Sequence, residues 1–136
     1  MPRTRRRQPP IGPNAMQEAA ALHREGRLAE AERIYATIVA CMPDHFDALH
    51  LLGVLRQEQS RPAEALSLIA AALRLNACSA DAHANYGLVL DGLGCYADAA
   101  ASFECALAID PGHADALAGR ERTLAAFARR DASPRW

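Results

Sequence analysis

The chain has 136 residues, of which 51% are hydrophobic and 23% charged, a composition typical of a globular domain. Its formal net charge is -1, so overall charge gives no reason to expect binding to nucleic acid or to acidic substrates. No apolar run approaches the roughly 18–20 residues of a membrane span, and QPPIGPN stands where a signal peptide would have its apolar region. We therefore expect a cytoplasmic protein. All basic residues are arginine and alanine is abundant, a coding bias that favours a bacterial source.

Residues 1–13 form a segment with four arginines, four prolines and one aliphatic residue. It offers too little apolar surface to offset the entropy lost on ordering, so we predict a disordered tail. The arginines could instead bind phosphate groups of nucleic acid or of an anionic membrane. They are Arg3, Arg5, Arg6 and Arg7. Met16, which opens the first good helical pattern, is an alternative start of the protein.

A first pair of helices is predicted at residues 16–25 and 28–41. Gly26 suits the end of the first helix, and Pro43 stops the second because proline lacks an N–H group. Apolar residues of the second helix recur at steps of three and four, which indicates one buried face. Residues 14–45 thus form one helix-turn-helix unit.

Two further pairs follow the same plan, in units 46–79 and 80–113. Their helices are predicted at 47–59, 63–75, 81–93 and 97–109, with Pro62 at the entry of the second pair's second helix. A last helix over 114–130 carries Arg120 and Glu121 at positions 7 and 8, where cover by a further helix would need apolar or small residues. We interpret it as a polar capping helix, followed by a short tail, 131–136, that ends in Trp136.

Aligned from Gly12, Phe46 and Ala80, the three units share residue types with a period of 34 residues. Small residues recur at position 8, alanine at position 20, large residues at position 24, glycine at position 15 of two units, and proline at position 32 of two. This pattern resembles the tetratricopeptide repeat (TPR) family, whose unit is a pair of antiparallel helices. The resemblance implies an all-α, right-handed superhelix of three repeats plus the capping helix. Glu18, Arg56 and Ala77 depart from the family pattern.

Four cysteines are scattered over the repeat register without a C-x-x-C pair, so neither a zinc site nor a disulfide framework is indicated. We predict reduced thiols, no metal and no cofactor. Five histidines show no partner pattern typical of catalysis, and His45 and His113 fall in the turns between units. We therefore predict that the chain is not an enzyme.

An aspartate recurs at position 2, as Asp47, Asp81 and Asp115. We interpret the series as helix caps, because an acidic side chain stabilises the free N–H groups of a helix start. A ladder of aspartates along one edge could also attract a basic peptide.

The family resemblance places a ligand on the concave face formed by the first helix of each pair. The corresponding residues form a mixed, moderately apolar groove suited to an extended peptide or a helix. They are Met16, Gln17, Ala20, His23, Arg24, His50, Leu51, Val54, Gln57, Glu58, Asn85, Leu88, Asp91 and Arg122. The carboxylate clamp of chaperone-binding members is excluded, since the chain has no lysine.

We expect a non-enzymatic module that binds a protein or peptide partner through this groove. The repeats also resemble those of bacterial O-GlcNAc-transferase-like enzymes, so a detached or truncated substrate-recruiting region of such an enzyme is the alternative; a terminal capping helix argues against it. Nucleic-acid binding through the arginine tail is a third hypothesis, and it predicts binding that weakens steeply with salt. The sequence does not decide the oligomeric state.

Overall fold

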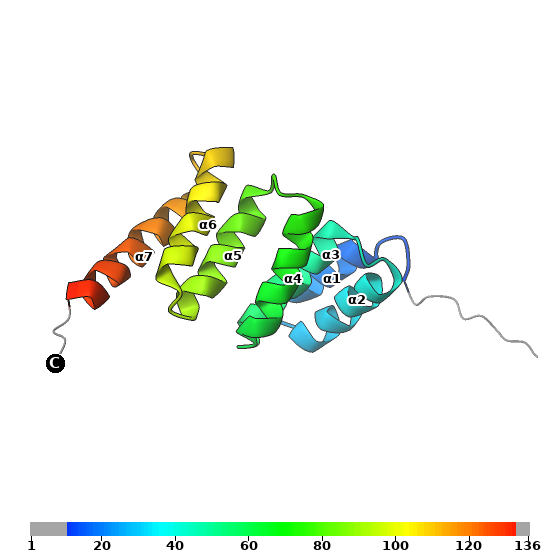
Figure 1. Ribbon diagram of the computed structural model, residues 1–136. Helices are drawn as coiled ribbons and strands as arrows, with labels where there is room; N and C mark the ends of the chain where they lie inside the picture. The colour runs from blue at the N-terminus through cyan, green and yellow to red at the C-terminus, as the bar shows by residue number, and fades with distance from the viewer. Residues whose placement is uncertain (1–10, 133–136) are drawn as a thin grey trace, which may run out of the picture.

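The computed structural model describes residues 11–132, and within them the chain is all-helical, with seven helices and no strand. The helices form three successive pairs and a final single helix, arranged in a row from α1 and α2 at one end to α7 at the other (Figure 1). Their bounds are α1 Ala15–Arg24, α2 Leu28–Cys41, α3 Phe46–Glu58, α4 Pro62–Leu75, α5 Ala80–Gly92, α6 Tyr96–Ile109 and α7 Ala114–Ala132. The all-α helix-pair architecture expected from the sequence is confirmed.

The first helix of each pair is followed, two residues after its end, by a residue with left-handed backbone geometry at position 15 of the unit. Gly26 and Gly94 both have φ of 81°, and Ser60 has φ of 62°. The N–H groups of the next residues bond back to carbonyls near the helix end, for example Arg61 N to Arg56 O at 2.9 Å. This closure reverses the chain within a few residues, so the second helix of each pair packs against the first.

The core lies where the helices of a pair cross. The glycine at position 8 of a unit faces the large residue at position 24 of the same unit: a Cβ on Gly53 would lie 2.6 Å from Ile69 Cγ1, and one on Gly87 would lie 2.8 Å from Phe103 Cε1. The alanines at position 20 are fully buried, as are Tyr35, Ile69 and Phe103. Small residues therefore let the two helix axes approach.

We predicted that the aspartates at position 2 cap the helix starts, and for the capping hydrogen bonds this prediction is wrong. The side chains at position 34 accept these bonds instead: His45 Nδ1 accepts from Ala48 N at 3.1 Å, and Ser79 Oγ accepts from Ala82 N at 3.1 Å. His113 Nδ1 accepts likewise from Ala116 N at 3.2 Å. The Asp81 carboxylate instead lies 2.6 Å from Nε2 of His113, at the end of the same unit.

Both ends of the described region differ in part from expectation. Ile11 packs against the cluster of Ala15, Ile38 and Ala48, so the packed structure begins before residue 14. At the other end, α7 runs two residues past the predicted end at 130, and its outer face is less polar than expected because Leu117, Leu124 and Phe127 are 40%, 47% and 46% exposed. The four arginines of the tail and Trp136 lie outside the described residues.

Arg56, which departs from the repeat pattern, is accommodated by ion pairs. Its side chain is only 12% exposed, with Glu32 Oε2 2.7 Å from one guanidinium nitrogen and Glu64 Oε1 2.8 Å from Nε. The pKa of Glu32 is lowered by its hydrogen bond from Gln59 and by Arg56.

Among the described residues, no helix is long and apolar enough to cross a membrane.

Candidate functional site

The first helices of the pairs, α1, α3 and α5, and the last helix, α7, carry the predicted groove residues, and polar side chains join each to the next. His23 of α1 lies 2.6 Å from Glu58 of α3. Asn85 of α5 lies 2.8 Å from His50 of α3, and Thr123 of α7 donates to Asp91 of α5 at 2.8 Å. These contacts fix the spacing of the helices along the groove.

A first hollow lies between α1 and α3, with a volume of about 520 Å³. His23 connects its two sides, because Nε2 contacts Glu58 and Nδ1 lies 3.3 Å from the Tyr35 hydroxyl. Burial raises the pKa of Tyr35, and the Glu58 charge adds to that effect. The hollow is lined by Ala20, His23, Arg24, Tyr35, Leu51 and Glu58.

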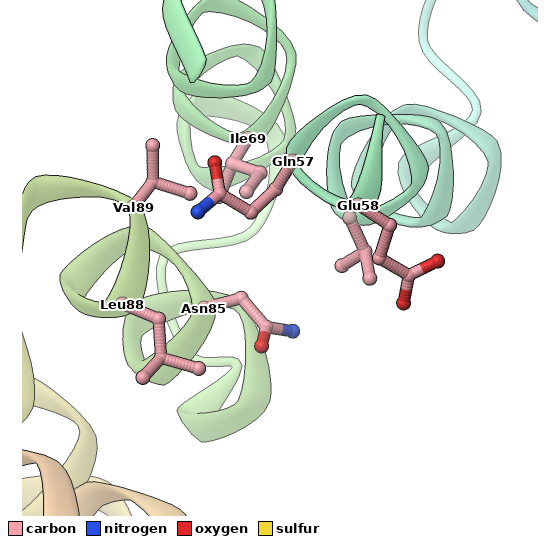
Figure 2. A pocket seen from close by; sticks show the side chains of 7 residues that line it. Gln57, Glu58, Ile69, Asn85, Leu88 and Val89 are labelled. Carbon is pink, nitrogen blue, oxygen red and sulfur yellow. The ribbon is translucent and has the colours of Figure 1, made fainter. Parts of the chain in front are cut away.

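A second hollow of about 230 Å³ lies between α3 and α5. Figure 2 shows the Gln57 amide directed toward the space between Ile69 and Val89, with Leu88 and Asn85 on the α5 side, whereas the Glu58 carboxylate points away. Glu58 lines both hollows, so they are neighbours along one groove. The lining comprises Val54, Gln57, Glu58, Ile69, Asn85, Leu88 and Val89.

The edge of this second hollow is held by a buried histidine. His50 is 8% exposed, and burial lowers its pKa, with the charges of Asp81 and Asp47 opposing that effect. Asn85 Nδ2 is a donor, so His50 Nε2 accepts the bond in its uncharged form. The hydrogen bond between His50 and Asn85 thus joins α3 to α5.

The remaining predicted residues divide between the groove and its surroundings. Asp91 and Arg122 meet at the α5–α7 end, with Arg122 Nε 3.5 Å from Asp91 Oδ2. Met16 lies instead beside Ile11 in a separate hollow at the first end of the helix row, because its side chain packs against the cluster of Ala15, Ile38 and Ala48. Gln17 is exposed and lines neither groove hollow.

Sequence reasoning missed three residues of the groove lining, namely Tyr35, Ile69 and Val89. Tyr35 and Ile69 occupy position 24, where large residues recur in all three units. They do fill the core, yet each also borders a hollow. The only signal in the sequence was the large side chain at position 24. It indicates that the residue packs in the core, but not that one side of it borders the groove.

The positions of the His, Cys, Asp and Glu side chains bear on whether the described residues could bind a metal ion together. Within residues 11–130, no three His, Cys, Asp or Glu side chains gather in a group that could hold a metal ion. The four cysteines are free and exposed. What the groove provides is a mostly apolar hollow between α3 and α5 and a hollow of mixed polarity between α1 and α3.

No family model matches the chain, and no curated protein matches its sequence. Among solved structures, the TPR domain of Spaghetti (RPAP3) bound to an HSP90 peptide is similar over 84% of this chain and 90% of its own, with TM-score 0.80 and 18% identity. YrrB, a TPR protein with a peptide-binding site described as unusual, is similar over 85% of this chain and 60% of its own, with TM-score 0.74 and 23% identity. The protein has the TPR fold.

A mutant O-GlcNAc transferase of Thermobaculum terrenum is also similar, at 30% identity and TM-score 0.78. The similar region covers 81% of this protein but only 21% of the transferase. The likeness therefore concerns a part of that enzyme.

Proposed function

We propose that the chain is a non-enzymatic TPR module that binds an extended peptide or helix of a partner protein in the groove along α1, α3 and α5. The observation that carries the proposal is the pair of adjacent hollows, one mostly apolar and one of mixed polarity, that share Glu58. Their edges are set by polar contacts between successive helices, so the groove is largely formed before a ligand arrives. Two structural neighbours support this choice, namely the RPAP3 domain bound to an HSP90 peptide and YrrB with its peptide-binding site.

A capture experiment from the cytoplasm of the source organism tests the groove. The groove variant is Leu88→Glu, which places a charge in the second hollow; the matched control is Leu75→Glu at the end of α4, where the leucine is 47% exposed and outside the groove. We expect a partner to be retained by wild type and Leu75→Glu and lost by Leu88→Glu at equal helicity. Equal retention by all three would place the binding surface elsewhere.

The second candidate is a substrate-recruiting part of an O-GlcNAc-transferase-like enzyme, favoured by the likeness to the Thermobaculum terrenum transferase. An antibody raised against the chain would decide whether it is joined to a catalytic region in the cell. This candidate predicts an immunoblot band far above the 14.6 kDa of the chain, or a glycosyltransferase that copurifies with it. A lone band at the mass of the chain without such a partner would reject it.

Binding of nucleic acid through the arginine tail and a cytoplasmic location stay predictions. The first is tested by the salt dependence of binding and by its loss when residues 1–14 are removed.

A further inference from the structure

Three exposed apolar side chains lie at one edge of the helix row, where the second helix of each pair ends. They are Met42, Leu75 and Ile109, with exposed fractions of 41%, 47% and 42%. Each stands beside the connection to the next helix, and these connections comprise residues 42–45, 76–79 and 110–113. Figure 1 shows the last two connections along the upper edge of the molecule. We call these residues, together with the first turns of α3, α5 and α7, the connection edge; no described part of the chain covers its apolar side chains.

The connection edge is also acidic. Position 2 places an aspartate in the first turn of α3, α5 and α7, and these aspartates are not needed as caps because position 34 supplies the capping bonds. Asp81 contacts His113. The other aspartates of the edge are exposed and form no ion pair within the described residues; they are Asp44, Asp47, Asp110 and Asp115. Of the last turns that border the edge, those of α2 and α6 contain no basic residue and that of α4 contains Arg74, so the edge has a net negative charge.

Arginine suits a surface that mixes exposed apolar side chains with carboxylates. Its methylene stem covers apolar surface while the guanidinium group stays in water. The guanidinium group also binds a carboxylate through two parallel hydrogen bonds, which are stronger than bonds between neutral groups. A purely apolar ligand would desolvate the aspartates without giving them a partner, and an acidic ligand would be repelled. The chemistry of the edge therefore selects an arginine-rich segment.

The chain itself contains such a segment. Four of its 15 arginines lie within residues 3–7, whereas all 16 acidic residues lie within residues 11–132. The segment joins the fold at the connection edge, because Ile11 lines one hollow together with Met42 and His45. The arginines are thus tethered next to the acidic connection between α2 and α3.

The tether is long enough for the arginines to reach several aspartates of the edge. Since an extended chain spans at most about 3.6 Å per residue, Arg7 reaches about 14 Å from Ile11 and Arg3 reaches about 29 Å. Neighbouring helices pack about 8–10 Å apart, so the starts of α3 and α5 fall within these distances. A short flexible tether also gives an effective concentration on the order of millimolar, an advantage that a segment from another molecule lacks.

We propose that the four arginines of the tail dock on the connection edge of their own chain, with their guanidinium groups on its aspartates and their stems over Met42 and Leu75. This contact lies on a different surface from the groove, so its failure would leave the proposed function untouched. The edge and a phosphate group compete for the same arginines, so docking weakens binding of nucleic acid through the tail.

NMR of the full chain tests the contact. The tail variant carries Arg3→Gln, Arg5→Gln, Arg6→Gln and Arg7→Gln. The backbone amides of Asp44 and Cys78 report on the edge, and those of Gly26 and Gly94, in the turns at the other ends of the helices, are references. At about 0.01 M salt, where charges interact over about 30 Å, the shifts of the edge amides should differ between wild type and tail variant while the references agree. At about 1 M salt the difference should disappear, because charges then interact over only about 3 Å.

Two variants with the same change in charge locate the contact. One carries Asp44→Asn and Asp47→Asn at the edge. The other carries Asp98→Asn in the first turn of α6 and Glu121→Gln in α7, both exposed and away from the edge. The heteronuclear NOE of amides 5–7 measures how strongly the segment is held on the ps–ns timescale. It should fall by about half or more in the edge variant and stay at the wild-type value in the other.

The proposal is overturned if the tail variant leaves the edge amides unchanged, if Gly26 and Gly94 respond as strongly, or if both charge variants lower the NOE equally. Shift differences that grow with protein concentration would also overturn it, since they would place the arginines on a second copy of the chain. Differences that are independent of concentration and are lost with salt and in the edge variant support the contact within one chain.

Discussion

At the scale of single residues, position 15 of each unit shows how one backbone angle limits the choice of side chain. Gly26 and Gly94 occupy this position with φ of 81°, while the middle unit places Ser60 there with φ of 62°. A residue with a Cβ in this left-handed region costs about 1–2 kcal/mol relative to glycine. Ser60 is therefore a strained residue in an otherwise regular turn.

Ser60→Gly is expected to raise the free energy of unfolding by about 0.5–1 kcal/mol, because relief of the strain exceeds the entropy that an added glycine gains in the unfolded chain. The matched control is Ser67→Gly, an exposed position inside α4, which should lower stability by about 0.5 kcal/mol. Urea unfolding of both variants measures the difference. A loss of stability in Ser60→Gly would contradict this explanation.

Phe103 is fully buried between glycines of α5 and α7. A Cβ on Gly87 would lie 2.8 Å from Cε1 of the ring, so Gly87→Ala forces the ring or the helix to move and should cost about 1–3 kcal/mol. Gly92→Ala is the control in the same helix. Its Cβ would meet only Gln57 Nε2 at 3.6 Å. Thermal unfolding should show a lower midpoint for Gly87→Ala alone.

At the scale of helices, the starts of α3, α5 and α7 depend on position 34. Ser79→Ala removes the oxygen that accepts from Ala82 N at 3.1 Å, and should lower the free energy of unfolding by about 1 kcal/mol. Ser67→Ala, inside α4 and exposed, removes the same hydroxyl without a cap and should leave stability unchanged or slightly higher. Equal effects of the two changes would reject the cap.

The bond between α3 and α5 makes stability depend on pH. Burial lowers the pKa of His50 below its ordinary value of 6.5, so the unfolded chain binds this proton more readily than the folded chain. The stabilising contribution is therefore fully present above pH 6.5 and is lost as pH falls toward the folded pKa. Wild type minus His50→Gln, measured by urea unfolding from pH 7.5 to 5, should show this loss. Parallel curves for the two proteins would contradict it.

The helices were predictable because their signals are local. Glycine or proline lies near the ends, and position 8 is small wherever a pair crosses, so the predicted and observed helices mostly differ by one residue. The contacts across the groove were not predictable in this way. His50 and Asn85 lie 35 residues apart, and their meeting depends on the distance between α3 and α5. The cap was misassigned because positions 34 and 2 are both polar beside the same helix start.

Some of the groove residues were predictable from the sequence and others were not. The family resemblance implied that Val54, Gln57 and Leu88 share one face, and the structure brings them around the second hollow. It could not show that Met16 packs away from them or that Ile69 reaches them from α4, since both depend on how neighbouring helices fit.

At the scale of the whole molecule, α7 completes the core of the third unit. A Cβ on Gly119 would lie 2.5 Å from the Phe103 ring, so the backbone of α7 rests directly on that ring. Thr123 of α7 is also fully buried and donates to Asp91. A repeat array buries its core only between neighbouring elements, so the end of the array needs this cover.

A chain that ends at Gly112 should therefore unfold at lower urea concentration than the full chain, or aggregate. Exposing Phe103 alone forfeits about 1.5–3 kcal/mol of apolar burial. The control is the full chain with Leu124→Gln and Phe127→Gln, whose side chains are 47% and 46% exposed on the outer face of α7. It should keep its free energy of unfolding within about 1 kcal/mol of wild type. If the shortened chain unfolds at the wild-type midpoint, α7 does not cover the core; if the control falls as far as the shortened chain, the outer face of α7 contributes as much as the buried one.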